Sequence, residues 1–171
     1  ALKPLQEKAE QSLRLKDGRK PAQIRRQVQE MAQKNLSPIR TQGELSSFLS
    51  FLEKTIQDDL PHLATTSTSR AYNKEWVDAI ELENILHLLK CATISALHRA
   101  ESRGVHFRED FPYTNNDAWL KENIIKFDNG VLEVTRRPVT TTSMTPPQGK
   151  VPYLDMLKKM MESRSDVGGH H

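Results

Sequence analysis

The sequence predicts a mainly α protein: a three- to four-helix, spectrin-repeat-like bundle followed by a β-hairpin and an extended tail. Two changes in pattern along the chain predict it. Apolar residues recur at helical spacing from residue 2 to residue 97. Beyond Pro112 the pattern becomes two β-rich runs around Asp128-Asn129-Gly130, and then a Thr-, Ser- and Pro-containing segment, 140–150, with little to bury.

The composition limits the size of the core and the class of partner. The chain has 171 residues, enough for one domain with an appended tail. Only 36% of residues are hydrophobic and the mean hydropathy is -0.64, so narrow apolar stripes must supply the core. The 25 basic and 22 acidic residues are mixed and leave a net charge of +3, which is a weak case for nucleic-acid binding.

No uninterrupted apolar stretch approaches the ~20 residues that cross a bilayer, and the first residues do not resemble a signal peptide. Any membrane link is therefore expected to run through a partner, at the cytoplasmic face. The single cysteine, Cys91, excludes an internal disulfide and fits a reducing compartment such as the cytoplasm. The chain begins at Ala1, directly in amphipathic sequence, which suggests a piece of a longer polypeptide.

Two short helices are predicted first. Residues 4–15 form one, which ends before Asp17-Gly18. Pro21 suits the first turn of the second, where its missing N–H needs no partner. Leu2, Leu5, Ala9 and Leu13 recur at helical spacing in the first helix, and Ile24, Val28, Met31 and Ala32 mark the buried face of the second.

The next two helices are longer. Thr41-x-x-Glu44 is a capping box that opens the third helix, which continues until Pro61 ends it; residues 63–70 are a loop. Asn73 caps the fourth helix, over residues 74–103, and Gly104 is expected to be its left-handed C-terminal cap. The fourth helix has the wide apolar face of a central helix, formed by Leu82, Ile85, Leu86, Leu89, Ala92, Ala96 and Leu97.

After Pro112, residues 124–127 and 131–135 are the predicted hairpin strands, and Arg137-Pro138 ends the second. A last short helix needs a docking surface, either on the bundle or on a partner chain. Its apolar residues are Tyr153, Leu154, Met156, Leu157, Met160 and Met161. The expected division is a helical domain over 1–112, a hairpin extension over 113–139 and a tail over 140–171.

The densest charged feature is the run 99–112, Arg-Ala-Glu-Ser-Arg-Gly-Val-His-Phe-Arg-Glu-Asp-Phe-Pro. Arginine forks match carboxylates, so we expect Arg103 and Arg108 to pair with Glu101 and Asp110. An exposed cluster of this kind is worth about 0–1 kcal/mol per pair, whereas removing one partner from a cluster buried against another domain costs about 3–5 kcal/mol. The candidate structural or interface residues are Arg99, Glu101, Ser102, Arg103, Gly104, His106, Arg108 and Asp110.

No catalytic, cofactor-binding or metal-ligating residue is assigned. His106 has no nucleophile or metal partner nearby in the sequence and is expected to be a hydrogen-bonded structural residue. The seven glycines include no Gly-x-Gly-x-x-Gly array, so the chain has no dinucleotide site of that kind. Trp76 and Trp119 are expected to anchor the core, and the other histidines to lie at the surface or an interface.

The run 99–112 resembles the Glu-Ser-Arg-Gly-x-His-x-Arg-x-Asp-x-Pro signature of the C-terminal helical domain of succinate dehydrogenase and fumarate reductase flavoproteins. Further segments over residues 2–139 are similar to the same family, whereas Ser37-Pro38 and the extension 142–164 depart from it. The matching residues outside the signature are Pro21, Ile24, Arg25, Gln29, Met31, Arg40, Tyr72, Asn73, Glu81, Glu83, Asn84, Leu86, Asp117, Trp119, Leu120, Arg137, Pro138 and Val139.

The resemblance implies a parent enzyme in which flavin adenine dinucleotide exchanges a hydride with succinate or fumarate. The groups that bind flavin and dicarboxylate lie in domains that precede this region, so none is carried over. The chain would brace the flavin-binding domain and contribute to contacts with the iron-sulfur subunit, and alone it would be inactive and colourless.

Two alternatives remain open. The same domain of L-aspartate oxidase or of the adenylylsulfate reductase flavoprotein looks similar here. A free-standing helical adaptor is the other, for example a nucleic-acid binder that uses Arg25, Arg26, Lys34 and Arg40.

Overall fold

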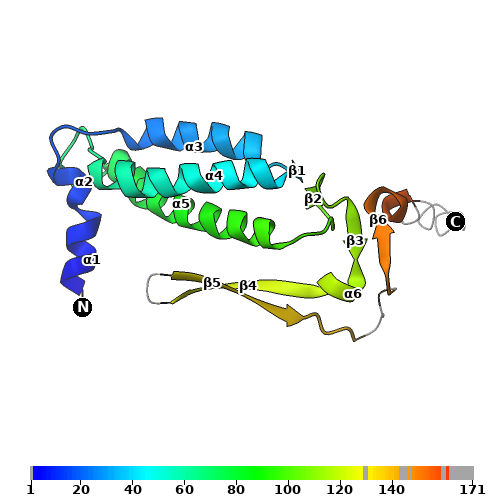
Figure 1. Cartoon of the computed structure of the whole chain (residues 1–171). Coiled ribbons are helices and arrows are strands. Elements are labelled where there is room, and N and C mark those ends of the chain that lie inside the picture. The colour runs from blue at the N-terminus through cyan, green and yellow to red at the C-terminus, as the bar shows by residue number, and fades with distance from the viewer. Residues whose placement is uncertain (1, 129–130, 143–145, 147, 159–160, 162–171) are drawn as a thin grey trace, which may run out of the picture. The chain divides into compact units, whose positions relative to one another are not determined.

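The computed structural model describes residues 2–128, 131–142, 146, 148–158 and 161 (Figure 1). The chain is mainly α and divides into two compact units, which we describe separately. The first comprises Ala1–Ser37 and Glu44–Ile94, and the second comprises Pro38–Gly43 and the chain from Ser95 onward. The fourth and fifth α-helices each run from one unit into the other.

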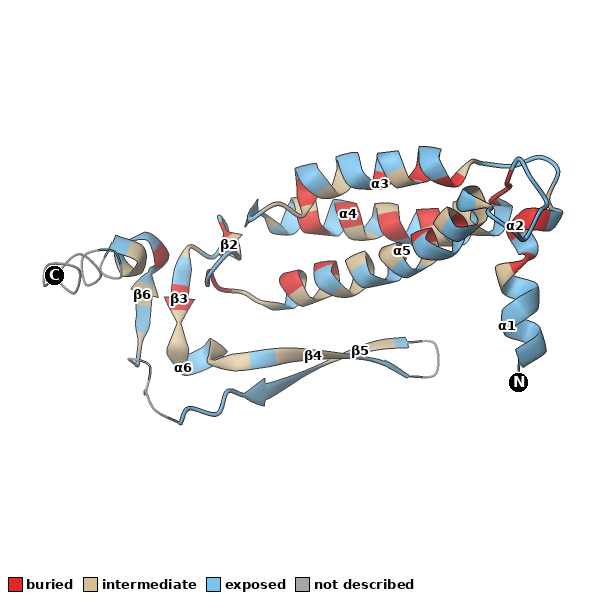
Figure 2. Ribbon diagram, turned by 180° about the vertical axis from the view of Figure 1, so that it is seen from behind, coloured by how far each residue is buried: buried red, intermediate tan, exposed pale blue. Residues whose placement is uncertain are grey.

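The first unit is helical. In both views α3, α4 and α5 lie side by side (Figures 1 and 2). Its elements are α1 (Leu2–Ala9), α2 (Gln11–Arg14), α3 (Pro21–Asn35), α4 (Gln42–Lys54), the π-helical turn η1 (Thr55–Asp59), the 3-10 turn η2 (Leu60–His62) and α5 (Lys74–His98). None of the described helices is long and apolar enough to cross a membrane.

One apolar core joins α3, α4 and α5. Ile24, Phe48 and Leu82 are fully buried, and each comes from a different helix. The other buried members are Val28, Leu52, Leu63, Ala79 and Leu86. The members from α3, α4 and α5 lie on the narrow apolar stripes that the helical spacing predicts, whereas Leu63 lies in the predicted loop; Figure 2 shows buried and exposed faces along these helices.

The first predicted helix, over 4–15, is wrong in one respect: it is broken at Glu10 into α1 and α2. The carbonyl of Ala9 accepts a hydrogen bond from the Trp76 indole N–H at 2.6 Å, and the backbone N–H of Leu13 donates instead to the Glu10 carbonyl at 3.1 Å. A long-range side-chain contact thus replaces one helical hydrogen bond, and the sequence spacing does not reveal it.

Gly18 lies where the chain passes close to another backbone segment. The Arg19 N–H donates to the His62 carbonyl at 3.0 Å, and the Ala64 N–H donates to the Arg19 carbonyl at 3.1 Å. A Cβ atom at Gly18 would lie 2.2 Å from the His62 carbonyl oxygen. Gly18, beside the predicted helix end, is therefore required for the close approach of these two backbone segments.

The third predicted helix is not α-helical to Pro61. It loses α-helical hydrogen bonding after Lys54 and continues as η1 and then η2. Pro61 lies in the first turn of η2, a position that tolerates the missing N–H.

Two expectations for the fourth helix are confirmed and two are wrong. Its start is confirmed, since the Trp76 N–H donates to Asn73 Oδ1 at 3.1 Å, and its burial of Leu82 and Leu86 is also confirmed. Its predicted end at residue 103 is wrong, because α5 ends at His98. Ala92 is exposed, whereas the next residue, Thr93, is fully buried and donates to the Leu89 carbonyl at 2.7 Å.

The second unit contains short paired strands in its described part. β1 (Ile39–Arg40) pairs in parallel with β2 (Phe107–Arg108), and β3 (Tyr113–Asn115) pairs antiparallel with β6 (Lys150–Pro152). The helix α6 (Asn116–Trp119) leads into β4 (Lys121–Asp128), which pairs antiparallel with β5 (Val131–Pro138). The runs 124–127 and 131–135 lie within β4 and β5, and the predicted turn residues Asn129 and Gly130 fall outside the described residues.

Lys150, the last residue of the segment predicted to be extended or mobile, belongs to β6. The last predicted helix is present over 153–158. Within it Tyr153 is buried and Met156 is half-buried, so this short helix has a partly covered face, while Met161 is exposed. Met160 lies outside the described residues.

Candidate functional site

The candidate site is the charged elbow, which we define as residues 99–115, the segment between α5 and α6. A tight two-residue turn shapes it: the N–H groups of Arg103 and His106 each donate to the other's carbonyl, at 2.8 and 3.0 Å. Gly104 has a φ of +58°. The left-handed conformation predicted for Gly104 is therefore confirmed, but its role as the helix cap is wrong, because α5 ends six residues earlier and Gly104 lies in this turn.

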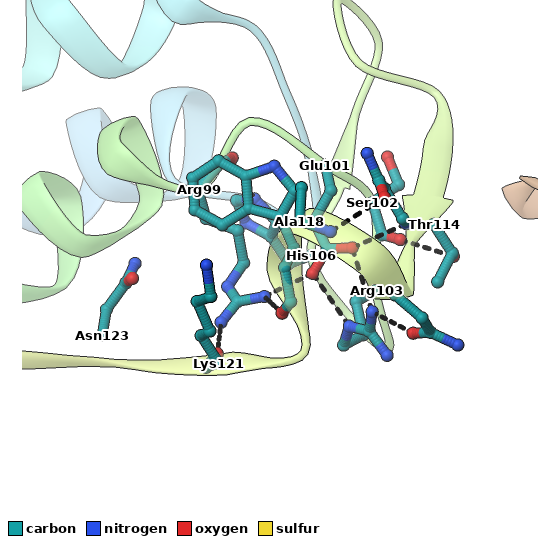
Figure 3. Close-up of polar contacts among 12 residues, drawn as sticks. Arg99, Glu101, Ser102, Arg103, His106, Thr114, Ala118, Lys121 and Asn123 are labelled. Carbon is teal, nitrogen blue, oxygen red and sulfur yellow. Dashed lines mark hydrogen bonds and ion pairs between the residues drawn. The ribbon is translucent and has the colours of Figure 1, made fainter. Parts of the chain in front are cut away.

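Glu101 is the anionic centre of the elbow. It is 1% exposed, and Figure 3 shows its carboxylate surrounded by donors. Arg103 makes a two-pronged contact, from Nε at 2.8 Å and Nη2 at 3.0 Å, and the Arg99 Nη1 group also donates to it. The Asn115 N–H adds a fourth donor at 3.0 Å. A buried carboxylate needs such pairing to offset the loss of water.

Arg99 connects the elbow to the end of α6 and the start of β4. Its Nη1 donates to the Trp119 carbonyl at 3.2 Å and its Nη2 donates to the Lys121 carbonyl. The guanidinium also lies 5.7 Å from the centroid of the Trp119 ring. Trp119 is half-buried, and the Arg136 guanidinium also lies over its ring, 4.4 Å from the ring centroid.

Arg108 is the second centre, and it is 1% exposed. Its Nε and Nη2 atoms form a bidentate pair with Asp110, at 2.7 and 2.6 Å. Its Nη1 donates at 3.0 Å to the carbonyl of Ala96, with longer contacts of 3.4 Å to those of Leu97 and Arg99. One guanidinium thus joins a carboxylate to the end of α5.

The last carbonyls of α5 are all satisfied by downstream side chains instead of a glycine cap. Besides the Arg108 contacts, the Asn123 amide donates to the Ser95 carbonyl at 3.0 Å, and Arg136 Nη2 donates to the His98 carbonyl at 3.2 Å. These carbonyls have no helical partner, and cations are favourable at a helix C-terminus. The arginines therefore neutralise the helix end and fix where the elbow begins.

Ser102 is fully buried and connects the elbow's strands. Its hydroxyl donates to the Phe111 carbonyl at 2.9 Å and accepts from the Arg108 N–H at 2.9 Å. Its carbonyl accepts from the Thr114 hydroxyl at 2.7 Å. A larger or purely apolar residue here would leave several buried groups without partners.

His106 is held as a neutral, hydrogen-bonded residue. Its Nε2 lies 3.2 Å from the Arg99 carbonyl, which makes Nε2 the protonated nitrogen of the ring. Burial lowers the pKa of His106; the hydrogen bond to Arg99 opposes this, and the charges of Arg40, Arg108 and Arg99 lower it further. The hydrogen bond expected for His106 is present, and its structural role stays a prediction.

Asp110 remains ionised beside Arg108. The hydrogen bonds from Arg108 hold the pKa of the Asp110 carboxyl below its ordinary value, against the opposing effect of burial. Its Oδ2 also accepts from the backbone N–H of Gln42, the first residue of α4, at 3.1 Å. Asp110 therefore links the elbow to the segment 38–43.

The tail covers the Gly104 turn. The Tyr153 hydroxyl donates to the Gly104 carbonyl, and its ring packs 5.5 Å from that of Phe107. The Tyr153 N–H donates to the Pro112 carbonyl at 3.1 Å. This contact had no sequence signal beyond the amphipathic spacing of the last helix.

The predicted pairs Arg103–Glu101 and Arg108–Asp110 are both present. The exposed-cluster alternative is wrong for Glu101 and Arg108, which are buried by the described chain itself. Burial against a separate domain is not needed to explain these two side chains. Asn123 and Arg136, which complete the arrangement, lie far along the sequence and were not predicted.

The other candidates lie outside the elbow. Trp76 is half-buried, so it is less of a core anchor than expected. His62 contacts the Asp58 carbonyl at 2.8 Å, and His87 lies 3.8 Å from Glu83. Arg25 pairs with Glu81 at 2.8 Å and Arg26 with Glu30 at 3.0 Å, which weakens the nucleic-acid alternative because these cations are already matched.

The described residues offer no group of three or more His, Cys, Asp or Glu side chains suited to a metal ion. They also do not fit a flavin dinucleotide by the phosphate-cradling route, since no described strand leads through a glycine-rich turn into a helix.

Comparison with known proteins agrees with the sequence resemblance. Residues 25–152 match the family model described as "Fumarate reductase flavoprotein C-term". The succinate dehydrogenase flavoprotein subunit of Rickettsia conorii is 32% identical over 132 residues, which are 77% of this chain and 22% of that protein. A fumarate reductase (CoM/CoB) subunit of Methanothermobacter marburgensis is 37% identical over 127 residues, or 72% of this chain and 23% of its own length.

Solved structures show the same fold. A mutant of E. coli quinol fumarate reductase superposes with a TM-score of 0.78 at 23% identity, and the match covers 86% of this chain and 26% of that one. The Sdh1 complex of Mycobacterium smegmatis gives a TM-score of 0.70 at 20% identity, over 84% of this chain and 25% of that one. The chain thus spans about a quarter of the proteins that it matches.

Proposed function

Since the chain belongs to the family of fumarate reductase flavoprotein C-terminal domains, we propose that it is that domain of an FAD-dependent enzyme interconverting succinate and fumarate. The observation that carries the proposal is the family match over residues 25–152, which includes the whole elbow. Relatives named as succinate dehydrogenase and fumarate reductase proteins, at 32% and 37% identity, support it.

Within that enzyme the chain acts as a brace. The elbow presents a fixed surface because its buried charges, Glu101 and Arg108, are satisfied internally. We propose that residues 1–112 form a three- to four-helix, spectrin-repeat-like bundle, with a hairpin extension over 113–139 and a tail over 140–171. Its partners are the flavin-binding domain of the same polypeptide and the iron-sulfur subunit, at the cytoplasmic face of a membrane reached only through other subunits.

The reaction itself belongs to the rest of the parent protein. FAD supplies hydride transfer there, and this chain's residues position the domain that holds it. The elbow residues Arg99, Glu101, Ser102, Arg103, Gly104, His106, Arg108 and Asp110 accordingly have structural and interface roles in the proposal and no catalytic one.

The test compares this 171-residue chain with the longer polypeptide that contains it. The isolated chain is expected to purify without flavin absorbance and to reduce no fumarate with a viologen donor. The longer polypeptide is expected to carry flavin and to reduce fumarate. Flavin bound to the isolated chain, or a longer polypeptide without flavin, would contradict the proposal.

A further inference from the structure

Arg40 differs from the other arginines at the elbow because its guanidinium is unmatched. Arg40 is half-buried in β1, and its Nε atom is buried without a hydrogen-bond partner. Among the described residues, none lies within ion-pair or hydrogen-bond distance of this guanidinium. The neighbouring Glu109 donates its backbone N–H to the Arg40 carbonyl at 3.1 Å, but its exposed carboxylate does not pair with the guanidinium.

The surroundings of Arg40 are positively charged. In the parallel pairing of β1 with β2, Arg40 lies opposite Arg108, and like charges in this position repel. The Asp110 carboxylate is already engaged by both prongs of Arg108, and Glu101 already serves Arg99 and Arg103. Burial lowers the pKa of Arg40, and the charge of Arg108 lowers it further. Beside the elbow, Arg40 is therefore a cation that pairs with no carboxylate of the described residues.

We propose that Arg40 is the docking residue of this domain and that it binds a carboxylate carried by a protein partner. This rests on the proposed function, in which that partner is the flavin-bearing part of the same polypeptide. Arg40 offers one planar guanidinium, and no described lysine is hydrogen-bonded beside it. One guanidinium matches the single charge and planar shape of a carboxylate better than the double charge of a phosphate. Ile39, next to Arg40, is 58% exposed, and a protein surface would cover it whereas a free small carboxylate would not.

The same substitution in two contexts tests the proposal. Arg40→Gln removes the fork and the charge, and thermal unfolding is followed for the isolated chain and for the longer flavoprotein that contains it. In the isolated chain the midpoint is expected to stay the same or rise, because an unmatched cation beside Arg108 is lost. In the flavoprotein it is expected to fall by roughly 2–4 °C, because the bound carboxylate loses its partner.

Two variants serve as controls. Arg40→Lys keeps the charge but not the fork, so it is expected to restore only part of the loss in the flavoprotein. Arg26→Gln removes an exposed arginine whose ion pair within the described residues is with Glu30, and is expected to change neither midpoint measurably. A fall of similar size in both contexts would show that Arg40 has a partner within the chain, and no change in either would show that it binds nothing; both results overturn the proposal.

Free carboxylate is tested separately on the isolated chain, with sodium acetate against sodium chloride at equal ionic strength. The contrary result is that acetate raises the unfolding midpoint of the wild type, but not of Arg40→Gln, by as much as the midpoint differs between the two proteins in the flavoprotein. That result would assign the site to a small ligand and overturn the proposal of a protein partner. If the longer polypeptide holds no flavin, the proposed function fails, and the comparison of Arg40→Gln in the two contexts still decides whether the partner is a protein.

Discussion

Arg108 has two functions in the elbow that usually belong to different residues. It neutralises Asp110 through two short hydrogen bonds, and it donates to the carbonyls that end α5. A helix end of this kind is usually capped by glycine in the left-handed conformation. Here a buried side chain ten positions beyond the helix end takes part in the capping, together with Asn123 and Arg136.

Replacing Arg108 with methionine is expected to destabilise the protein strongly. The substitution keeps much of the volume but leaves Asp110 without its cation and the Ala96 carbonyl without its side-chain donor. Removing one partner of a buried pair costs about 3–5 kcal/mol. Urea unfolding followed by circular dichroism measures the loss. Arg26→Met, at an arginine whose side chain is 82% exposed, is the control and should cost less than about 1 kcal/mol.

His106 predicts a pH dependence of stability. Its pKa is lowered in the folded protein, so between that value and its unfolded value of about 6.5 the unfolded chain binds more protons. The contribution of His106 is therefore complete above about pH 6.5 and declines as the pH falls towards the folded pKa. Protonation would also place a cation near Arg40, Arg99 and Arg108.

Denaturant unfolding at several values between about pH 7.5 and pH 5 tests this effect. Wild type is expected to lose stability as the pH falls, and His106→Gln, which cannot titrate but keeps an N–H donor, is expected to lose less. Equal losses in the two proteins would show that other groups cause the dependence. His87→Gln, at a half-exposed histidine beside Glu83, is the matched control and should behave like wild type.

At the scale of elements, the apolar periodicity predicted where α3, α4 and α5 lie, because burial on one face repeats every three to four residues. It could not predict where α5 ends. The residues that complete that end, Asn123 and Arg136, lie 28 and 38 positions beyond the carbonyls that they satisfy. Likewise the break at Glu10 depends on Trp76, 67 positions from Ala9. Contacts of this range leave no local pattern.

The elbow shows the same division. The local pairs of Arg103 with Glu101 and of Arg108 with Asp110, each two residues apart, could be predicted from residue type and spacing. The burial of these pairs could not, because it depends on tertiary packing. The pairing of β6 with β3 was also missed, since three residues in a polar segment carry no strand signal.

The pairing of the tail with the elbow gives a prediction for Tyr153. Tyr153→Phe removes the donor to the Gly104 carbonyl and keeps the ring on Phe107, so it is expected to cost about 0.5–1.5 kcal/mol. Amide exchange should also become faster at His106, whose N–H bonds across the turn. Tyr113→Phe, at a tyrosine that is 40% exposed, is the control, and an effect of the same size there would contradict a specific role for Tyr153.

At the scale of the whole molecule, the chain consists of two compact units with different kinds of stabilisation. The first depends on an apolar core between helices, with Phe48 and Leu82 fully buried. The second depends largely on buried polar groups, with Glu101, Ser102 and Arg108 each 0–1% exposed. Apolar packing tolerates changes of shape better than a polar network tolerates the loss of one member.

This difference predicts that a substitution in the elbow lowers the stability of the second unit more than that of the first. Trp76 lies in the first unit and Trp119 in the second, so Trp76→Phe and Trp119→Phe each leave one fluorescent reporter. Arg108→Met is expected to lower the urea midpoint reported by Trp119 more than that reported by Trp76, because Arg99 holds Trp119 to the elbow while Trp76 bonds to Ala9. Leu52→Ala, which opens a cavity in the helical core, should show the opposite order. Each substitution could instead lower the urea midpoints reported by Trp76 and Trp119 equally. The two units then unfold as one, and the apolar core and the polar elbow do not stabilise separate parts of the chain.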